Sequence, residues 1–377
     1  MRTKQNSTAW FSKGVCAAAL LAGLAAPGAA QAQAIIKVSD TVNIKFGMQI
    51  QAWADFNQDT ASAGYIDNLF IRRVRFLVAG QVAPDVTFFF MTDNPNLGKA
   101  PKSLTTGFMT QDALLTWKIA DAFRLEGGLF IVPLSRAGLS STVQFFTLDI
   151  SGTATQFAGP SGTNGLRDTG FQARGYLLDR KQLEYRVAVT QGLRTAAVAG
   201  VDGGSRNSFR STAFLNYNFF ETENGYVLGG TNLGKKKMLN LSGGVDTQST
   251  YSAYSANLFT TLPVGKGGEI GGQAQWTHAD GGTWIPANAL PRQNDYLVEA
   301  AFLIPESKVQ PFAKWEAQKY SDSYTVSKDI SRWGIGLNYY VSKQNLKLTA
   351  QYLRITPDAS SISATNEFTL QLQLFYF

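Results

Sequence analysis

The sequence predicts an all-β protein, a transmembrane antiparallel β-barrel of about sixteen strands. Three observations carry this prediction. Polar and apolar residues alternate with a period of two through most of the chain. The links between the alternating segments are short and long in turn, as they are in membrane barrels. Of the 377 residues, 16% are charged and 12% are aromatic, and the mean hydropathy of −0.10 excludes several helical spans of about 20 apolar residues each.

Residues 1–34 are interpreted as a secretory signal peptide, which leaves residues 35–377 for the barrel. Arg2, Lys4 and Lys13 precede an apolar run, and a tail of small residues follows it. Removing this segment deletes three basic residues and no acidic one, so the formal charge falls from +7 to +4. The only cysteine, Cys16, leaves with it, so no disulfide stabilises the mature chain. With so mild a charge and no basic stripe, we expect no nucleic-acid partner.

The first predicted strand covers residues 42–56, whose even positions are apolar or Ala and whose odd positions include Asn, Lys, Gln and Asp. It is longer than the usual globular strand of about 5–6 residues, but it suits a tilted membrane strand of about 9–11 with protruding ends. The same alternation predicts further strands at 68–80, 86–93, 111–119, 123–131, 168–178, 182–191, 207–220, 237–248, 251–261, 268–277, 294–304, 309–319, 330–340, 346–354 and 366–377.

The alternation is clearest in two of the last strands and fixes which residues should face lipid. We expect Leu337 and Leu348 to face lipid, and Gly336 and Thr349 to face the lumen and to accept polar residues.

The links divide into two sets, which predicts the two ends of the barrel. Short links are expected to be periplasmic turns; they lie at 83–85, 120–122, 179–181, 263–267, 305–308 and 341–345. Long polar links are expected outside; they lie at 57–67, 94–110, 132–167, 192–206, 278–293, 320–329 and 355–365. The link at 221–236 breaks the pattern, because it is long where a turn is due.

Aromatic residues sit at many of the predicted strand ends, where their rings can lie at the boundary between lipid and water. The chain finishes on Phe377, which looks like the C-terminal signal that the assembly machinery of bacterial outer-membrane proteins recognises. Leu370, Leu372 and Leu374 hold even positions, whereas Phe375 and Phe377 are odd, so the facing of the last residues stays open.

Charged residues on the polar face give the candidate pore-lining and anion-binding site. Acidic and basic residues nearly cancel there, but seven of the basic residues belong to the second to eighth strands, so one wall is expected to be basic. The alternative is that these charged residues only keep the lumen hydrated and select no ion. The candidates are Arg73, Arg75, Lys118, Arg124, Arg136, Arg167, Arg174, Arg186 and Arg210.

The longest link, 132–167, is the candidate constriction. It follows the fifth strand, where a third outer loop falls, and its only charges are Arg136, Asp149 and Arg167. Links longer than about 12–15 residues are usually functional or disordered. We expect this one to fold inward, packed by Phe145, Phe146 and Phe157, and to set the size limit of the pore; a plain surface loop is the alternative.

The sequence offers little reaction chemistry. His278 is the only histidine and stands at a predicted loop edge, no Cys or His cluster can hold zinc or haem, and no cofactor is expected. Two readings compete with a channel. An outer-membrane barrel enzyme of the lipase type would need His278 beside an activated Ser, and an exported soluble β-sandwich that binds carbohydrate would be monodisperse in water without detergent.

Several short motifs in order along the chain resemble the family of phosphate-selective porins O and P. They are Ile71-Arg72-Arg73-Val74-Arg75-Phe76 with Gly80, Phe88 to Asp93, Asp112-Ala113, Gly128 to Pro133, Leu166 to Gly170, and Leu233-Gly234-Lys235-Lys236-Lys237. The resemblance implies a sixteen-stranded barrel of the Gram-negative outer membrane, in contact with its lipid, that forms a homotrimer and passes small anions such as phosphate. The candidate loop offers only Arg136 and Arg167, so the residues themselves favour a wider, weakly selective pore for small hydrophilic solutes.

Overall fold

The computed structural model describes residues 34–59, 64–99, 104, 107–155, 159–194, 208–321, 329–359 and 362–377. The predicted signal peptide lies outside these residues except for Ala34, and Phe157 of the candidate loop also lies outside them.

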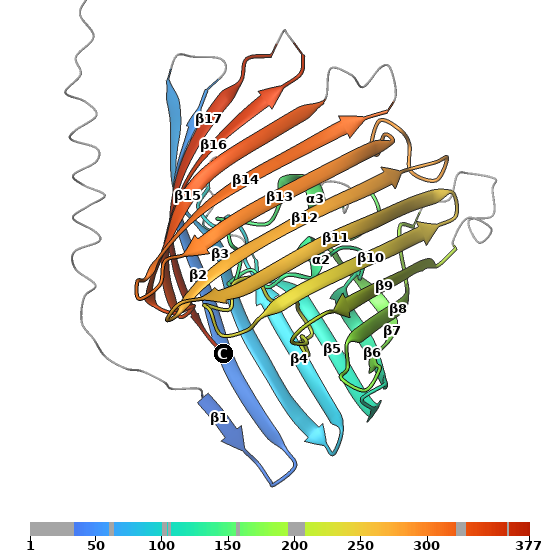
Figure 1. Ribbon diagram of the computed structural model, residues 1–377. Coiled ribbons are helices and arrows are strands. Elements are labelled where there is room, and N and C mark those ends of the chain that lie inside the picture. Colours follow the sequence, from blue (N-terminus) through green and yellow to red (C-terminus); the bar gives the residue numbers. More distant parts are fainter. Residues whose placement is uncertain are drawn as a thin grey trace, which may run out of the picture. The chain divides into compact units, whose positions relative to one another are not determined.

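Sixteen antiparallel strands, β2 to β17, form a closed barrel (Figure 1): each pairs with the next, and β17 pairs with β2. The predicted fold class is therefore confirmed. The strands are β2 (Asn43–Gln58), β3 (Tyr65–Ala83), β4 (Val86–Asp93), β5 (Met109–Ala120), β6 (Phe123–Ile131), β7 (Arg167–Leu177), β8 (Leu183–Thr190), β9 (Arg210–Asn218), β10 (Met238–Gln248), β11 (Tyr251–Val264), β12 (Gly268–Asp280), β13 (Gln293–Leu303), β14 (Val309–Tyr320), β15 (Ile330–Ser342), β16 (Leu346–Pro357) and β17 (Thr365–Tyr376). The closed barrel excludes the sandwich reading.

The sequence did not predict a short strand, β1 (Ala34–Lys37), which lies along the same edge of β2 as β17 and begins where β17 ends. β1 pairs with β2 from Phe46 to Asn43, and β17 pairs with β2 from Met48 onwards. Gly47 lies between the two pairings, and a Cβ atom there would lie 2.4 Å from the Phe377 ring. Only glycine leaves room for the terminal phenylalanine at this point.

The barrel wall is apolar on its exposed side and polar on its buried side, the reverse of a soluble protein. Leu69 and Phe171 are 80% and 70% exposed, whereas Gln51 and Asp112 are fully buried. The predicted facing holds in β15, where Leu337 is exposed and Asn338 is buried. This pattern is stable only if lipid covers the outer side and polar groups meet inside the barrel.

Gly336 departs from the expectation. A Cβ atom there would lie 2.2 Å from the Phe312 ring and 2.4 Å from the Ala350 carbonyl oxygen. The prediction that position 336 accepts polar side chains is therefore wrong, because neighbouring strands leave no volume for them.

Aromatic residues form a band on the outer face of β11 to β16, near the end that carries the long links. Trp276 pairs with Tyr296, and Trp315 pairs with Trp333. The Tyr296 and Trp315 rings lie 6.4 Å apart between centroids, and the Trp333 and Tyr352 rings 5.6 Å, spacings at which aromatic pairs attract. Such a band suits one boundary between lipid and water.

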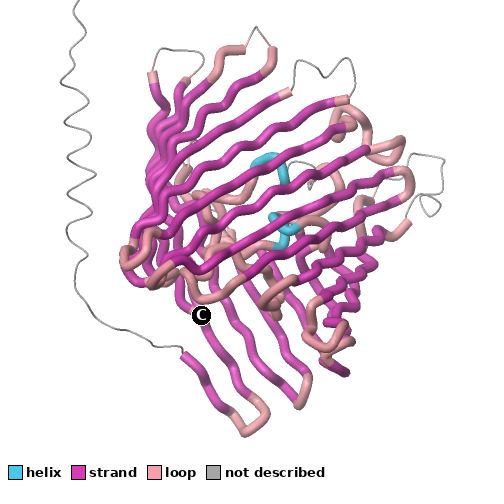
Figure 2. The backbone as a smooth tube through the Cα atoms, viewed as in Figure 1, coloured by secondary structure: helices cyan, strands magenta, loops and turns pink. Residues whose placement is uncertain are grey.

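Two helical turns, α2 (Arg136–Leu139) and α3 (Gly152–Thr155), belong to the link between β6 and β7 (Figure 2). Within the described residues no helix is long and apolar enough to span a membrane. Below, segment 132–166 denotes the link between β6 and β7, and segment 219–237 denotes the link between β9 and β10. The first segment connects its strands at the end of the barrel that carries the long links, which we call the loop end. The second connects its strands at the opposite end, the turn end, where the other connections are short.

Candidate functional site

Segment 132–166 makes hydrogen bonds with inward-facing side chains around much of the wall. Arg75 of β3 donates to the Thr142 hydroxyl over 2.9 Å, and Asn338 of β15 donates to the Phe146 carbonyl over 2.7 Å. The Thr147 hydroxyl donates to Glu299 of β13 over 2.7 Å. Further bonds join the segment to β2, β11, β12, β16 and β17. Because the bonds reach strands on opposite sides of the barrel, they fix the segment at many points.

Segment 219–237 meets the first segment and pairs with it through the backbone. The Leu228 amide donates to the Leu139 carbonyl over 2.8 Å, and the Ser141 amide donates to the Leu228 carbonyl over 2.9 Å. This explains the anomalous length of the predicted link at 221–236: the chain here does not simply turn but contacts the link from the other end of the barrel.

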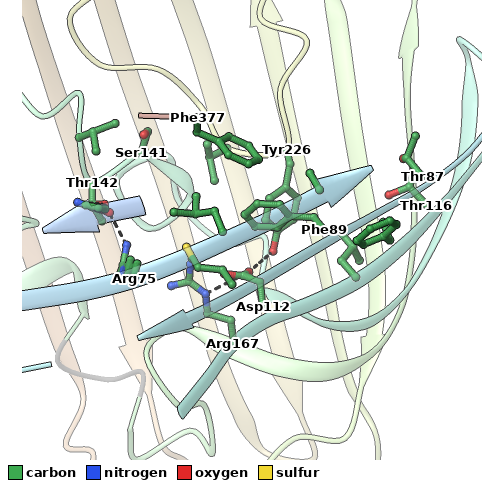
Figure 3. Close-up of a pocket in the computed structure, with 18 of the residues that line it drawn as sticks. Arg75, Thr87, Phe89, Asp112, Thr116, Ser141, Thr142, Arg167, Tyr226 and Phe377 are labelled. Carbon is green, nitrogen blue, oxygen red and sulfur yellow. Dashed lines mark hydrogen bonds and ion pairs between the residues drawn. The ribbon is translucent and has the colours of Figure 1, made fainter. Parts of the chain in front are cut away.

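A cavity of about 480 Å³ lies between β3 to β7 on one side and the two segments on the other. We call it the β3–β7 cavity. Its charged lining comprises four arginines, Arg75, Arg124, Arg167 and Arg174, and one carboxylate, Asp112. Figure 3 shows how Arg75 reaches Thr142, and how Arg167 and Tyr226 both reach Asp112. Four of the nine predicted site residues therefore share one cavity.

Four predicted residues also stand in one row across the inner wall, which we call the basic row. Lys118 of β5 is opposite Arg124 of β6, Arg124 is opposite Arg174 of β7, and Arg174 is opposite Arg186 of β8. Like charges directly across a sheet repel. Carboxylates offset this repulsion: Glu126 accepts from Arg174 over 2.8 Å, and Glu184 lies 2.8 Å from Arg186.

The basic row ends at the turn end of the barrel, where Lys118 is exposed. Its ammonium group lies 3.0 Å from Asp121 in the turn between β5 and β6. Hydrogen bonds from Lys181 and Lys118 lower the pKa of Asp121 to about 2. Lys118 thus stands at the mouth of the barrel and does not line the β3–β7 cavity.

The other predicted arginines hold the two segments in place. Arg73 bonds Asp149 over 2.5 Å, and Arg136 bonds Glu223 over 2.7 Å. Arg186 donates to the Tyr226 carbonyl over 2.8 Å, and Arg210 is paired with Asp246 and lies against Ser161. These four guanidinium groups are almost fully buried, and each is held by a carboxylate, so their contacts position the two segments.

Tyr226 is the main lining residue that the sequence did not single out. Its hydroxyl donates to Asp112 over 2.6 Å and accepts from the Ile131 amide over 2.9 Å. Burial and the neighbouring Asp112 carboxylate raise the pKa of Tyr226 well above its usual value. The sequence feature that points to Tyr226 is the link at 221–236, which contains apolar residues and is long where a short turn is expected.

The last residues of the chain, whose facing stayed open, contribute to the cavity. Phe375 pairs with Gln49, whose side chain is buried inside, and both Phe375 and Phe377 line the cavity. The Phe377 ring lies 6.1 Å from that of Phe89 and 4.3 Å from the Lys45 ammonium nitrogen.

His278 lies within β12, in the aromatic band on the outer side. Its Nδ1 is 3.1 Å from the Asn294 side-chain oxygen, and its ring stacks with Trp276 at 6.3 Å. The contacts of the described residues place Asn294 and aromatic rings around it, whereas a lipase-type site requires a serine hydroxyl there. Among the same residues no group of three or more His, Cys, Asp or Glu could hold a metal ion.

Solved structures of outer-membrane channels share this architecture at 10–12% sequence identity. The anion-selective porin from Comamonas acidovorans matches with a TM-score of 0.62 and 12% identity over 89% of this chain and 100% of that one. OmpF of Salmonella typhi, solved with daunomycin, gives 0.59 and 10% over 91% and 100%, and the outer-membrane channel DcaP of Acinetobacter baumannii gives 0.56 and 12% over 90% and 99%. No protein-family model matches the sequence, and neither does any curated protein.

The chain therefore has the fold of outer-membrane porins, a sixteen-stranded antiparallel barrel. At this level of identity the likeness concerns the fold, and the resemblance to the phosphate-selective family rests on the sequence motifs.

Proposed function

We propose that this protein is a porin of the Gram-negative outer membrane, a passive water-filled channel that carries out no reaction and passes small hydrophilic solutes with a preference for anions. The observation that carries the proposal is the β3–β7 cavity: an internal space in a barrel with an apolar outer face, lined by four arginines and one carboxylate. Fixed positive charge in a narrow polar space raises the local concentration of anions.

The preference is proposed for small anions in general rather than for phosphate alone. A tight phosphate site needs several free donors that converge on one ion and replace its hydration. Arg75, Arg167 and Arg174 already donate to Asp93, Asp112 and Glu126. Their remaining effect on a passing anion is electrostatic, which favours weak selectivity.

Segment 132–166 is proposed as the constriction, together with segment 219–237. Both line the cavity, through Ser140 to Val143 and through Tyr226 and Val227. We also propose that residues 1–34 are an export signal and that the protein forms a homotrimer. Chemical cross-linking in mild detergent tests the trimer.

Reversal potentials in planar bilayers test the function. In a gradient of potassium chloride the protein should prefer chloride, and Arg124→Gln should move the reversal potential toward cation preference because it removes a charge that lines the cavity. Arg332→Gln, which removes a charge from β15 on another part of the inner wall, is the matched control and should have a smaller effect. Equal effects of the two variants would show that ions do not pass through the β3–β7 cavity. A folded protein without conductance would refute the proposed channel function.

A further inference from the structure

The inner face of β3, β4 and β5 carries an apolar patch where a porin lumen is usually polar. Leu77 pairs with Met91 across β3 and β4, and Phe89 pairs with Leu114 across β4 and β5. All four line the β3–β7 cavity. Apolar side chains on the wall of a water-filled passage gain stability when another apolar surface covers them. The rest of the chain already buries Leu77, Met91 and Leu114, whereas Phe89 stays partly exposed.

Aromatic and apolar groups from elsewhere in the chain extend this patch. The Phe89 ring lies 5.7 Å from that of Tyr226 and 6.1 Å from that of Phe377, and Val227 also lines the cavity. The cavity thus has one continuous apolar region made from the wall, segment 219–237 and the C-terminus (Figure 3).

Arg124 lies in the same cavity and is its least neutralised arginine. The nearest carboxylate oxygen that pairs with it belongs to Asp121 and is 4.0 Å away, and its Nε–H is buried without a hydrogen-bond partner. Arg75, Arg167 and Arg174, by contrast, have carboxylate oxygens within 2.8–3.1 Å. A guanidinium group with so little compensation favours an added anion.

We propose that the β3–β7 cavity binds small organic anions with a flat apolar body, the class of aromatic monocarboxylates. The carboxylate would bind at Arg124, next to Arg174, and the ring would pack on the partly exposed Phe89, whose neighbour across the strands is the buried Leu114. A volume of about 480 Å³ lies within the range of ligand pockets, roughly 300–1,000 Å³. A hydrated inorganic anion such as phosphate gains nothing from the apolar region. This inference rests on the proposed channel and names the solutes that the channel favours.

Benzoate is the probe, with acetate and benzyl alcohol as its two matched analogues. Acetate keeps the carboxylate without the ring, and benzyl alcohol keeps the ring without the charge. Benzoate should interrupt the chloride current in a concentration-dependent way and do so at least about tenfold more strongly than either analogue, a difference of about 1.4 kcal/mol. Equal potency of benzoate and acetate, or of benzoate and benzyl alcohol, would overturn the proposal.

Two variants and two controls locate the site. Leu114→Asn and Arg124→Gln should each weaken the benzoate effect about threefold or more, because one loses apolar contact and the other a charged donor. Leu303→Asn and Arg332→Gln change an inward-facing leucine and arginine that do not line the cavity, and they should leave the benzoate effect intact. The proposal fails if the controls weaken benzoate as much as the cavity variants do.

Binding of benzoate to the folded protein in detergent, followed by ligand-observed NMR, separates this inference from the channel function. A protein that prefers anions in bilayers but treats benzoate and acetate alike in both assays would refute the inference and leave the channel standing. Benzoate binding that depends on Arg124 and Leu114 in a protein without conductance would support the site and refute the channel.

Discussion

Arg136 and Glu223 form a buried, two-pronged ion pair that joins the segment from the loop end of the barrel to the segment from its turn end. The two guanidinium nitrogens lie 2.7 and 3.1 Å from the two carboxylate oxygens, and the guanidinium carbon lies 3.5 Å from the centre of the Phe259 ring. Arg136 also donates to the Gly229 carbonyl over 2.7 Å. Arg136 was expected to be an anion ligand, but these contacts occupy its charge.

Breaking this pair should loosen both segments without unfolding the barrel. Arg136→Gln or Glu223→Gln leaves a buried charge without its partner, which typically costs about 3–5 kcal/mol. We expect faster hydrogen exchange at the Leu139 to Leu228 backbone contact, measured by mass spectrometry on peptides from the two segments. The double variant should exchange more slowly than the sum of the single effects predicts, because it leaves no unpaired charge. Strictly additive effects would show that the two residues do not act as a pair.

Asp149 should hold segment 132–166 to β3 across most of the pH range. Burial raises the pKa of Asp149, but the nearby Arg73 and Arg72 guanidinium groups lower it by more than burial raises it. The pKa of Asp149 therefore lies below its ordinary value of 3.8. A carboxylate whose pKa is lower in the folded state than in the unfolded state stabilises the fold at pH values above its unfolded-state pKa. This stabilisation is lost as the pH falls through the folded-state pKa. Open-channel current noise should therefore stay constant between pH 7 and about 4.

Asp149→Asn should raise that noise already at pH 7, since it leaves Arg73 without a carboxylate. Asp358→Asn, which removes an exposed partner of Lys319 at the loop end, is the control and should be silent. Identical noise in the two variants would show that Asp149 does not tether the segment.

Replacing residues 140–160 by a short Gly/Ser linker should raise single-channel conductance and admit larger solutes. The deletion removes Ser140 to Val143 from the lining of the cavity but leaves its four arginines in place, so anion preference should change little. Heat-dependent mobility on a denaturing gel checks that the barrel still folds. A folded deletion variant with unchanged conductance would move the constriction to segment 219–237.

Leu337→Arg should cost roughly 2–4 kcal/mol of barrel stability, the usual effect of a cation on the lipid face near the bilayer midplane. Leu337 is 42% exposed on the outer side of β15. Thr349→Ser, which keeps the hydroxyl that donates to Asn338 inside the barrel, should cost little. Unfolding titrations in lipid measure both, and a larger cost at 349 than at 337 would reverse the assigned facing.

The sequence by itself determined the barrel. Period-two alternation is a local property, because consecutive side chains of a strand point to opposite faces, so the sixteen strands and the facing of most of their residues follow from residue order alone. The short strand β1 was missed because four residues show too little alternation. The facing of Phe375 and Phe377 stayed open because alternation within the last turn was ambiguous, and pairing with β2 decided it.

Only the tertiary structure decided what each basic residue does. Arg136 and Arg124 look alike in the sequence, as lone arginines expected to face the pore. Arg136 meets a carboxylate 87 positions away because two segments from opposite ends of the barrel come together, while Arg124 has its paired carboxylate oxygen at 4.0 Å. An ion pair depends on distances of a few ångströms between residues far apart in the chain, and alternation along a strand carries no information about those distances.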